Sequence, residues 1–356
     1  MKLFESIRGI FGGGRNTADL AKWLDLPEDD LRDWRKGHPP EPRGFQYSYS
    51  RFEIPKRRWG TRAIDAPSDA LKDLQRRILR RLLNPLPVHP AATGFVRGRS
   101  IVDNAKPHAG RGVVINIDLA DFFPSIAAER VRATFRALGW GGEAAEILTN
   151  ICTHEGRLPQ GAPTSPAISN LVCRKLDARL AALMRANKLR RIVLRNPGTG
   201  EIMGETTSPQ VIEGAYTRYA DDLTFSLAAF GRNKRRRPRP KDAPKRPPLK
   251  APSRALLTRI CKIIEDEGFI IQKRKKVRVQ RAHQRQTATG LVVNARVSLP
   301  REVRRRIRAM QHRERKGLLD AKGKNALRGW EALAGMVARQ REGGATGGGN
   351  FTSQST

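Results

Sequence analysis

The sequence predicts an α+β fold because two kinds of apolar pattern occur in one chain. Apolar residues recur at helical spacing in segments that begin near Ser68, Pro166 and Ser253. Short apolar or alternating runs at 113–118 and 216–226 are typical of strands. Aspartates end the first run and interrupt the second, so we expect carboxylates at the rim of a sheet.

Length and composition limit the class of protein. The 356 residues suffice for one large lobed domain or two to three small ones with a sizeable core. No apolar run approaches the ~20 residues that cross a bilayer, and the first residues carry too short an apolar stretch for a secretory signal. The three cysteines are widely spaced, which indicates neither a disulfide framework nor a zinc knuckle. We therefore expect a cytoplasmic protein with no membrane partner.

The charge indicates a polyanionic partner. The chain has 69 Lys and Arg against 34 Asp and Glu, a net charge of +35, which favours nucleic acid or an anionic membrane surface. The segment 231–254 contributes eleven basic residues and one acid, so most of the excess lies elsewhere. Basic residues spread in this way suit an extended groove better than a single basic tail.

The elements of the first half follow in order. Thr17 is positioned to cap a first helix, and 37–50 reads as a loop rich in Pro and Gly. A hairpin with a basic tip is predicted over 52–65. A strongly periodic helix follows Ser68, and Pro85 ends it. The buried strand at 113–118 completes this half.

The second half predicts a helix near 143–152 and a longer helix that Pro166 opens. Residues 195–210 read as a loop or loose hairpin, and 216–226 as a hairpin with an Asp pair at its turn.

Three further predictions concern the chain after that hairpin. The Pro- and Arg-rich stretch 231–254 has too little apolar content to fold, and we interpret it as a tolerated charged loop rather than an RNA contact. A helix should begin at Ser253 and end at Gly268. Residues 301–328 form a basic helical region, which suits either an RNA-binding surface or an ordinary solvated helix face.

Three aspartates form the candidate catalytic group. Asp118 ends a strand, and Asp221 and Asp222 lie at a hairpin turn. Carboxylates gathered at a sheet rim are hard oxygen ligands suited to Mg²⁺, and two such ions support in-line phosphoryl transfer. An aspartate considered alone is more often a turn former or a helix cap. The catalytic interpretation therefore depends on the sequence motifs in which these three aspartates occur.

The sequence motifs around these aspartates resemble those of the reverse transcriptase family. Residues 118–126 (DLADFFPSI) look like its first catalytic motif, and 219–222 (YADD) match the YxDD box. Between them, 158–166 (LPQGAPTSP) match the loop that positions template and nucleotide in bacterial members. Gly268-Phe269, followed by Lys275, resembles the later palm motif, and 54–81 resembles the fingers segment. The ordered set is far more specific than a lone YxDD.

The resemblance implies a right-hand polymerase with helical fingers, an antiparallel-sheet palm and a small helical thumb. The expected divisions are an N-terminal helical extension (1–50), fingers and palm (51–300, with the insertion 231–254), a thumb (301–342) and a flexible tail (343–356). The resemblance also implies two Mg²⁺ ions, with Mn²⁺ as a substitute, bound by four residues: Asp118, Leu119, Asp221 and Asp222.

Nucleotide-binding roles also follow from the resemblance. Phe123 would clash with a ribonucleotide 2′-hydroxyl, and the alternative is a core Phe beside Phe122. Gln160 and Gly161 would let backbone approach the incoming nucleotide, unless they form an ordinary turn.

Basic residues of the fingers and palm remain less definite. Arg57, Arg58 or Arg62 would grip the triphosphate, and a solvated hairpin tip is an alternative for all three. Lys275 would neutralise the leaving pyrophosphate, although two neighbouring lysines compete for that role.

Two further boxes resemble retron reverse transcriptases. Residues 104–108 (NAKPH) look like the NAxxH element, and 288–291 (ATGL) resemble the VTG element, with Ala288 in place of Val. By this resemblance, four residues are candidates for RNA binding: Asn104, His108, Thr289 and Gly290. His108 alone would more often be a capping or core histidine.

A retron enzyme copies part of its own structured non-coding RNA, which is template and primer, into branched multicopy single-stranded DNA. The partners implied are that RNA, the RNA–DNA hybrid, dNTPs and a separate effector protein in anti-phage defence. From the length after the thumb-like region we also expect none of the extra domains of group II intron proteins. The alternatives are a diversity-generating reverse transcriptase and an RNA-binding defence component that does not depend on catalysis.

Overall fold

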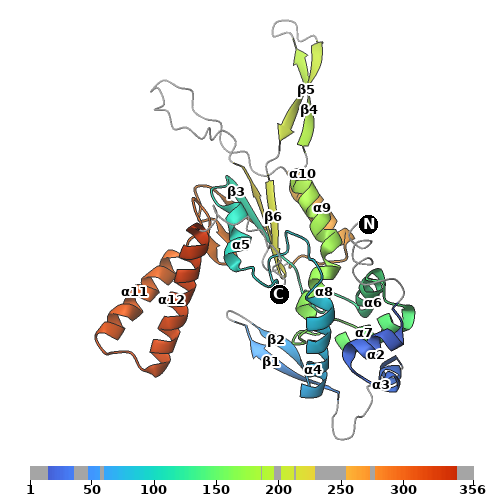
Figure 1. Cartoon of the computed structure of the whole chain (residues 1–356). Helices are drawn as coiled ribbons and strands as arrows, with labels where there is room; N and C mark the ends of the chain where they lie inside the picture. The colour runs from blue at the N-terminus through green and yellow to red at the C-terminus, as the bar shows by residue number, and fades with distance from the viewer. Residues whose placement is uncertain are drawn as a thin grey trace, which may run out of the picture. The chain divides into compact units, whose positions relative to one another are not determined.

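The computed structural model describes residues 15–35, 47–56, 60–185, 187–195, 202–211, 214–228, 254–272 and 277–342. The chain divides into two compact units, each made of three stretches. The first unit consists of Met1–Arg97, Leu119–Arg179 and Cys261–Arg274, and the second of Gly98–Asp118, Leu180–Ile260 and Lys275–Thr356. Helices and antiparallel strand pairs together confirm the predicted α+β class (Figure 1).

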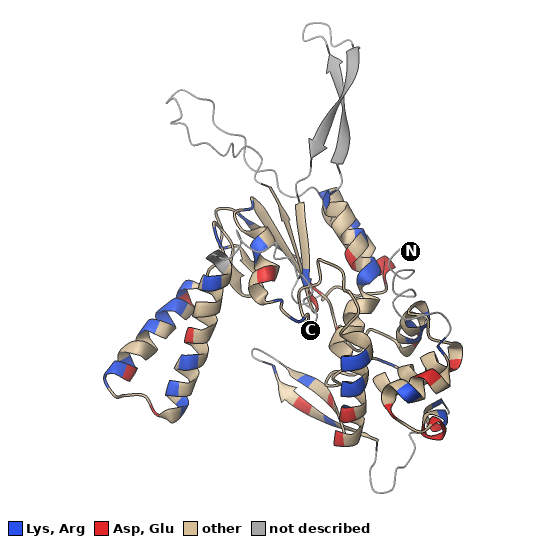
Figure 2. Ribbon diagram, in the orientation of Figure 1, with Lys and Arg blue, Asp and Glu red and all other residues tan. Residues whose placement is uncertain are grey.

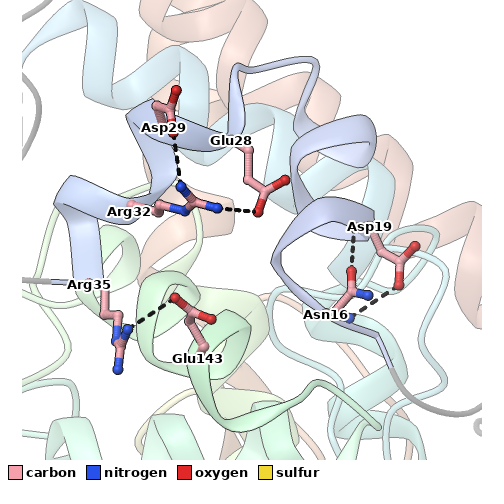
Figure 3. A network of polar contacts seen from close by, with 7 residues as sticks. All are labelled: Asn16, Asp19, Glu28, Asp29, Arg32, Arg35 and Glu143. Carbon is pink, nitrogen blue, oxygen red and sulfur yellow. Dashed lines mark hydrogen bonds and ion pairs between the residues drawn. The ribbon is translucent and has the colours of Figure 1, made fainter.

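The first unit opens with two short helices, α2 (Thr17–Leu24) and α3 (Glu28–Arg35). Asn16 caps α2, because its Oδ1 accepts from the Asp19 N–H at 2.9 Å while its own N–H donates to Asp19 Oδ2 at 3.1 Å (Figure 3). This capping box satisfies donors that the first helical turn leaves open. The expected cap, Thr17, is instead a buried residue of the first turn.

Helix α3 packs on α7 (Gly142–Cys152) of the same unit. Trp34 is buried in α3, and Arg35 Nη1 bonds Glu143 Oε1 of α7 at 3.2 Å (Figure 3). Exposed ion pairs of this kind contribute at most about 1 kcal/mol, so burial of the apolar face dominates the attachment.

The predicted hairpin is present as β1 (Tyr49–Pro55) and β2 (Thr61–Pro67), paired antiparallel along their whole length. Residues 57–59 at its tip lie outside the described residues. Helix α4 (Asp69–Ile78) follows and continues as a π-helical turn, η1 (Leu79–Leu83), before Pro85, as expected for the end of this helix.

Four more helices have one or both ends in the first unit: α6 (Ala128–Ala137), α8 (Ser165–Val172), α9 (Arg174–Arg185) and α10 (Arg254–Asp266). The single helix predicted from Pro166 is wrong, because the backbone turns at Cys173, with ψ at 0°, and separates α8 from α9. The predicted end of α10 at Gly268 is confirmed by its left-handed φ of +75°.

A four-stranded antiparallel sheet, in the order β6-β7-β3-β8, lies in the second unit (Figure 1). Its strands are β3 (Val113–Asp118), β6 (Gly214–Tyr219), β7 (Asp222–Leu227) and β8 (Arg278–Arg281). Val114 and Ile115 of β3 are completely buried. The run is therefore apolar on both faces, which explains why it lacks alternation.

Two smaller strand pairs belong to the second unit, β4 (Asn187–Arg195) with β5 (Ile202–Val211), and β9 (Thr287–Ala288) with β10 (Leu291–Val292). Of the segment read as a loop or loose hairpin at 195–210, Arg195 and 202–210 belong to a longer strand pair that starts at Asn187, and 196–201 lie outside the described residues. The predicted insertion lies outside the described residues except for its last, Arg254.

The rest of the second unit is helical: α5 (Ile101–Ala105), the 3₁₀ turn η2 (Lys106–His108), α11 (Arg301–Arg315) and α12 (Ala321–Glu342). Helices α11 and α12 lie side by side (Figure 1). Ile307 and Val337, one from each helix, join the apolar core that includes Val114 of β3. The tail from 343 onward lies outside the described residues. None of the helices within the described ranges is both long enough and apolar enough to cross a bilayer.

Candidate active site

The register of the sheet brings two of the three candidate carboxylates together. Asp118 is the last residue of β3 and stands directly opposite Asp222, the first residue of β7. Residues opposite each other in an antiparallel pair have Cβ atoms about 4.5–5.5 Å apart and point to the same face. Asp118 is half-buried and Asp222 is exposed. The two carboxylates are therefore neighbours at one edge of the sheet.

Asp221 lies in the turn that joins β6 to β7. Tyr219 pairs with Asp222, which leaves Ala220 and Asp221 as a two-residue connection. Ala220 has a left-handed φ of +57°, a conformation that is energetically unfavourable for any residue with a Cβ atom. Arg218 Nη1 donates to the Ala220 carbonyl oxygen at 3.3 Å from a completely buried position. A buried guanidinium thus holds the turn that carries Asp221.

Sequence reasoning did not select Arg218. The available signal was an arginine inside a strand whose other residues are apolar, aromatic or hydroxyl-bearing, at 214–219. A cation in such a run has to find partners when buried, so it marks a place where the fold depends on a polar contact.

The donor set at this edge fits a divalent cation with oxygen ligands. Carboxylates are the preferred protein ligands of Mg²⁺, and a cation would relieve the repulsion between the opposed Asp118 and Asp222. Within the described residues, no three His, Cys, Asp or Glu side chains are grouped closely enough to hold a metal ion together. Leu119, the other expected metal contact, is buried, and its backbone forms a bridge with Ile271.

The two neighbouring phenylalanines after Asp118 differ in burial. Phe122 is buried and stacks on Phe269, with ring centroids 6.0 Å apart. Phe123 is half-buried, and its ring lies 5.4 Å from that of Phe122. The residue that fills the core of the first unit is therefore Phe122, which leaves Phe123 partly accessible.

The loop containing Gln160 and Gly161 is fixed against the hairpin of the first unit. The Asp65 N–H on β2 donates to the Gln160 carbonyl oxygen at 2.9 Å. Gly161 has φ of +142°, and a Cβ atom there would lie 2.4 Å from the Asp65 carbonyl oxygen. Glycine is therefore required at 161 by the approach of the chain's own backbone, an intramolecular reason that the sequence did not reveal.

Only one of the expected nucleotide-binding cations lies among the described residues. Arg62 is exposed on β2, opposite Ile54 of β1. Arg57 and Arg58, at the hairpin tip, and Lys275, after β-bridge residue Ile271, lie outside the described residues.

The two retron-like boxes contact each other in the second unit. Asn104 Nδ2 donates to Thr289 Oγ1 at 3.4 Å, and Thr289 Oγ1 donates to the Ile101 carbonyl oxygen at 3.2 Å. Asn104 is completely buried, whereas Thr289 is half-buried and Gly290 is exposed. Thr289 has a left-handed φ of +45°. Of the four candidate RNA-binding residues, solvent reaches Thr289 and Gly290, whereas Asn104 and His108 are buried.

His108 is completely buried against the hairpin that carries the aspartates. Its Nδ1 lies 2.8 Å from Ser226 Oγ and its Nε2 lies 2.7 Å from Thr217 Oγ1. Because the Thr217 hydroxyl donates to the Asn104 carbonyl oxygen, it accepts from His108, which assigns the proton to Nε2. Burial first, and then nearby Arg111, lower the His108 pKa to about 3. A neutral imidazole thus connects β6 to β7, and in this structure its ring is closed to RNA.

Lys and Arg residues recur along helices α11 and α12 (Figure 2). A groove of about 460 Å³ lies beside them, with Arg296, Arg304 and Arg308 among its lining residues. Leu299 and Ile307 give the same groove an apolar lining. Cations around an apolar surface match the two chemical faces of a nucleotide, its phosphate and its base.

An antiparallel sheet with aspartates at one edge is the arrangement expected of an enzyme that transfers phosphoryl groups with the help of divalent cations. The chain belongs to the reverse transcriptase (RNA-dependent DNA polymerase) family, whose sequence profile matches residues 54–281.

Several curated relatives are retron enzymes. The chain is 37% identical over 343 residues to the retron Mx162 reverse transcriptase of Myxococcus xanthus, covering 90% of this chain and 62% of that protein. It is 40% identical over 321 residues to the retron Mx65 reverse transcriptase of the same organism, covering 84% and 63%. For the retron Ec86 reverse transcriptase of Escherichia coli, identity is 35% over 252 residues, covering 70% and 64%. The chain thus spans a little under two thirds of the length of these relatives.

Proposed function

We propose that this protein is an RNA-directed DNA polymerase of retron type. The observation that carries the proposal is the register pair Asp118 and Asp222, with Asp221 in the adjoining turn, in a chain of the reverse transcriptase family. The similarity to three retron reverse transcriptases supports the finer assignment.

Asp118, Asp221 and Asp222 would hold two Mg²⁺ ions, with Mn²⁺ as a substitute, and Leu119 would contribute to the same site. When bound, such ions activate a 3′-hydroxyl and neutralise charge on the leaving pyrophosphate. The strained turn at Ala220, held by Arg218, would keep Asp221 at the edge of the sheet.

The nucleotide would be positioned mainly by residues of the first unit, with Lys275 of the second unit as an additional cation. Phe123 would exclude a ribose 2′-hydroxyl, a role that its partial exposure supports. The Gln160–Gly161 backbone would align template and nucleotide. Arg62, together with Arg57 and Lys275, would contact the triphosphate, because cations match phosphate oxygens in charge and hydrogen bonding.

RNA would be recognised by the second unit, whose helices would serve as the thumb of a right-hand polymerase. Thr289 and Gly290 present an accessible turn, while buried Asn104 and His108 would support that turn and the hairpin from inside. Arginines of α11 supply phosphate contacts, whose strength depends on salt. The expected partner is a structured non-coding RNA that acts as template and primer.

The biological product would be branched multicopy single-stranded DNA joined to RNA, made in anti-phage defence beside a separate effector protein. Nucleic acid that copurifies with the protein expressed from its native locus tests this programme. We expect one abundant short DNA joined to RNA through a branch that resists ordinary ribonuclease. Linear complementary DNAs would indicate a diversity-generating or other reverse transcriptase, and RNA alone an RNA-binding component that does not depend on catalysis.

A further inference from the structure

Phe95 combines two features that are individually uncommon. Its side chain is 46% exposed, and its backbone has a left-handed φ of +61°. Bulky residues rarely adopt this conformation, because the Cβ atom meets neighbouring backbone. Strain of this kind persists only where the surroundings fix the backbone, and it concentrates at functional sites.

The surroundings of Phe95 do fix the backbone. Asn170, almost completely buried in α8, donates from Nδ2 to the carbonyl oxygen of Gly94 at 2.9 Å. Ala92 and Thr93, just before that glycine, are also buried. The loop is therefore anchored in the core of the first unit, and its aromatic ring is presented toward solvent at a cost in backbone strain.

The ring of Phe95 lies beside Phe123. Their centroids are 6.0 Å apart with the planes tilted by 35°, inside the range of attractive aromatic pairs. Phe123 also contacts Phe122, which is itself held by the buried Phe269. Phe123 thus has a fixed aromatic contact in the core, Phe122, and a second one, Phe95, whose side chain is about half exposed.

We propose that Phe95 is a positioning residue for Phe123 and thereby sets the discrimination between deoxyribonucleotides and ribonucleotides. The inference rests on the proposed polymerase function and on Phe123 as the group that excludes the 2′-hydroxyl. Without the Phe95 ring, Phe123 gains rotational freedom and excludes the 2′-hydroxyl less completely. Phe95 acts only through Phe123 and does not touch the reacting atoms.

The test measures kcat/KM for dTTP and for UTP separately, with the full chain, Mg²⁺ and a poly(rA)–oligo(dT) template-primer. Phe95→Gly removes the ring and also relieves the left-handed strain, so it should fold at least as well as the wild type. We expect its dTTP-to-UTP selectivity to fall by roughly 2- to 10-fold, the range given by one aromatic pair, mainly through a gain for UTP. Phe95→Tyr keeps the ring and should keep the selectivity.

A matched control is Phe52→Ala, which removes an aromatic ring of nearly equal exposure, 48%, from β1. Its selectivity ratio should equal that of the wild type. In a Phe123→Ala background, Phe95→Gly should have no further effect on the ratio, which a purely structural role for Phe95 would not predict.

The outcomes separate the two proposals. Synthesis by the wild type with unchanged selectivity in a folded Phe95→Gly variant would overturn the inference while the proposed function stands. Loss of selectivity in Phe52→Ala as well would also overturn it, because the effect would not be specific to the pair. No incorporation of either nucleotide by the wild type would contradict both.

Discussion

At the scale of single residues, His108 shows how a motif that suggests recognition can have a structural role. Its place in the NAxxH-like element makes His108 a candidate for RNA binding, and the alternative interpretation is a capping or core histidine. The structure places the ring between Thr217 and Ser226, one on each strand of the hairpin that carries Asp221 and Asp222. Nothing in the local sequence reveals this, because those two partners lie more than a hundred residues further along the chain.

The burial of His108 has a consequence for pH dependence. Its pKa is lowered from 6.5 to about 3. Between these two pH values the imidazole is protonated in the unfolded chain and neutral in the folded chain. The free energy of unfolding should therefore decrease as the pH falls below about 6.5, by at most about 1.4 kcal/mol per pH unit from this group. Urea denaturation of wild type and His108→Gln at pH 7, 6 and 5 measures this component, which should be missing in the variant.

At pH 7 the amide of His108→Gln can replace one donor and one acceptor, whereas His108→Ala leaves two buried hydroxyls without this partner. The alanine variant should lose about 1–3 kcal/mol per hydroxyl. Equal pH slopes for wild type and His108→Gln would contradict a neutral buried imidazole.

Gly161 gives a second residue-scale prediction. Gly161→Ala places a Cβ atom 2.4 Å from the Asp65 carbonyl oxygen at a φ of +142°, so the loop must move or the protein must lose stability. We expect the free energy of unfolding to decrease by more than about 2 kcal/mol, because the close contact adds to the cost of the backbone conformation; urea denaturation measures the change.

The matched control for that variant is Gly156→Ala. This glycine is also left-handed, with φ of +72°, but a Cβ atom there meets nothing within 4 Å. Its cost should stay near 1–2 kcal/mol, the cost of the conformation alone. Equal decreases in the two variants would show that the approach of β2 does not explain the glycine.

At the scale of elements, the sequence predicted best where a pattern is local. The strand ending at Asp118 and the hairpin around Asp221 and Asp222 were both predicted, because an apolar run and an alternating run are complete within a few residues. The break between α8 and α9 was missed, since Cys173 is neither Gly nor Pro and the apolar spacing continues across it. The strand pair starting at Asn187 was underestimated for lack of a clear alternation.

Helix α11 left two interpretations open, an RNA-binding surface or a solvated face, and a salt titration distinguishes them. Arg304→Gln with Arg308→Gln should weaken binding of the cognate RNA. The slope of log K against log salt should become shallower by about 0.7–0.9 for each phosphate that the variant no longer neutralises. The slope is measured by filter binding at several salt concentrations.

The control is the same charge change on α3, Arg32→Gln with Arg35→Gln, where both arginines are paired with acids. A slope reduced equally in the control pair would mean that net charge, rather than the groove beside α11, governs binding.

At the scale of the whole molecule, the ordered motifs predicted the family over most of the chain, and the match to residues 54–281 confirms it. Long-range relations were beyond the sequence. The hydrogen bond between Asn104 and Thr289 joins positions 185 residues apart, and the register of β3 with β7 fixes which aspartate faces Asp118. Such pairings depend on the folded core and leave no local periodicity to read.

We propose that the sheet-edge aspartates carry RNA-directed DNA polymerase activity in this chain. The most direct measurement is dTTP incorporation on poly(rA)–oligo(dT) with Mg²⁺ by wild type, Asp118→Asn and Asp221→Asn, with RNA binding measured in parallel. We predict synthesis by the wild type and a decrease of about 100-fold or more in both variants, with RNA binding retained. Asp69→Asn, at a 97% exposed side chain on α4, should behave as the wild type. Synthesis that persists in Asp118→Asn or Asp221→Asn would contradict the assignment of these carboxylates to the active site.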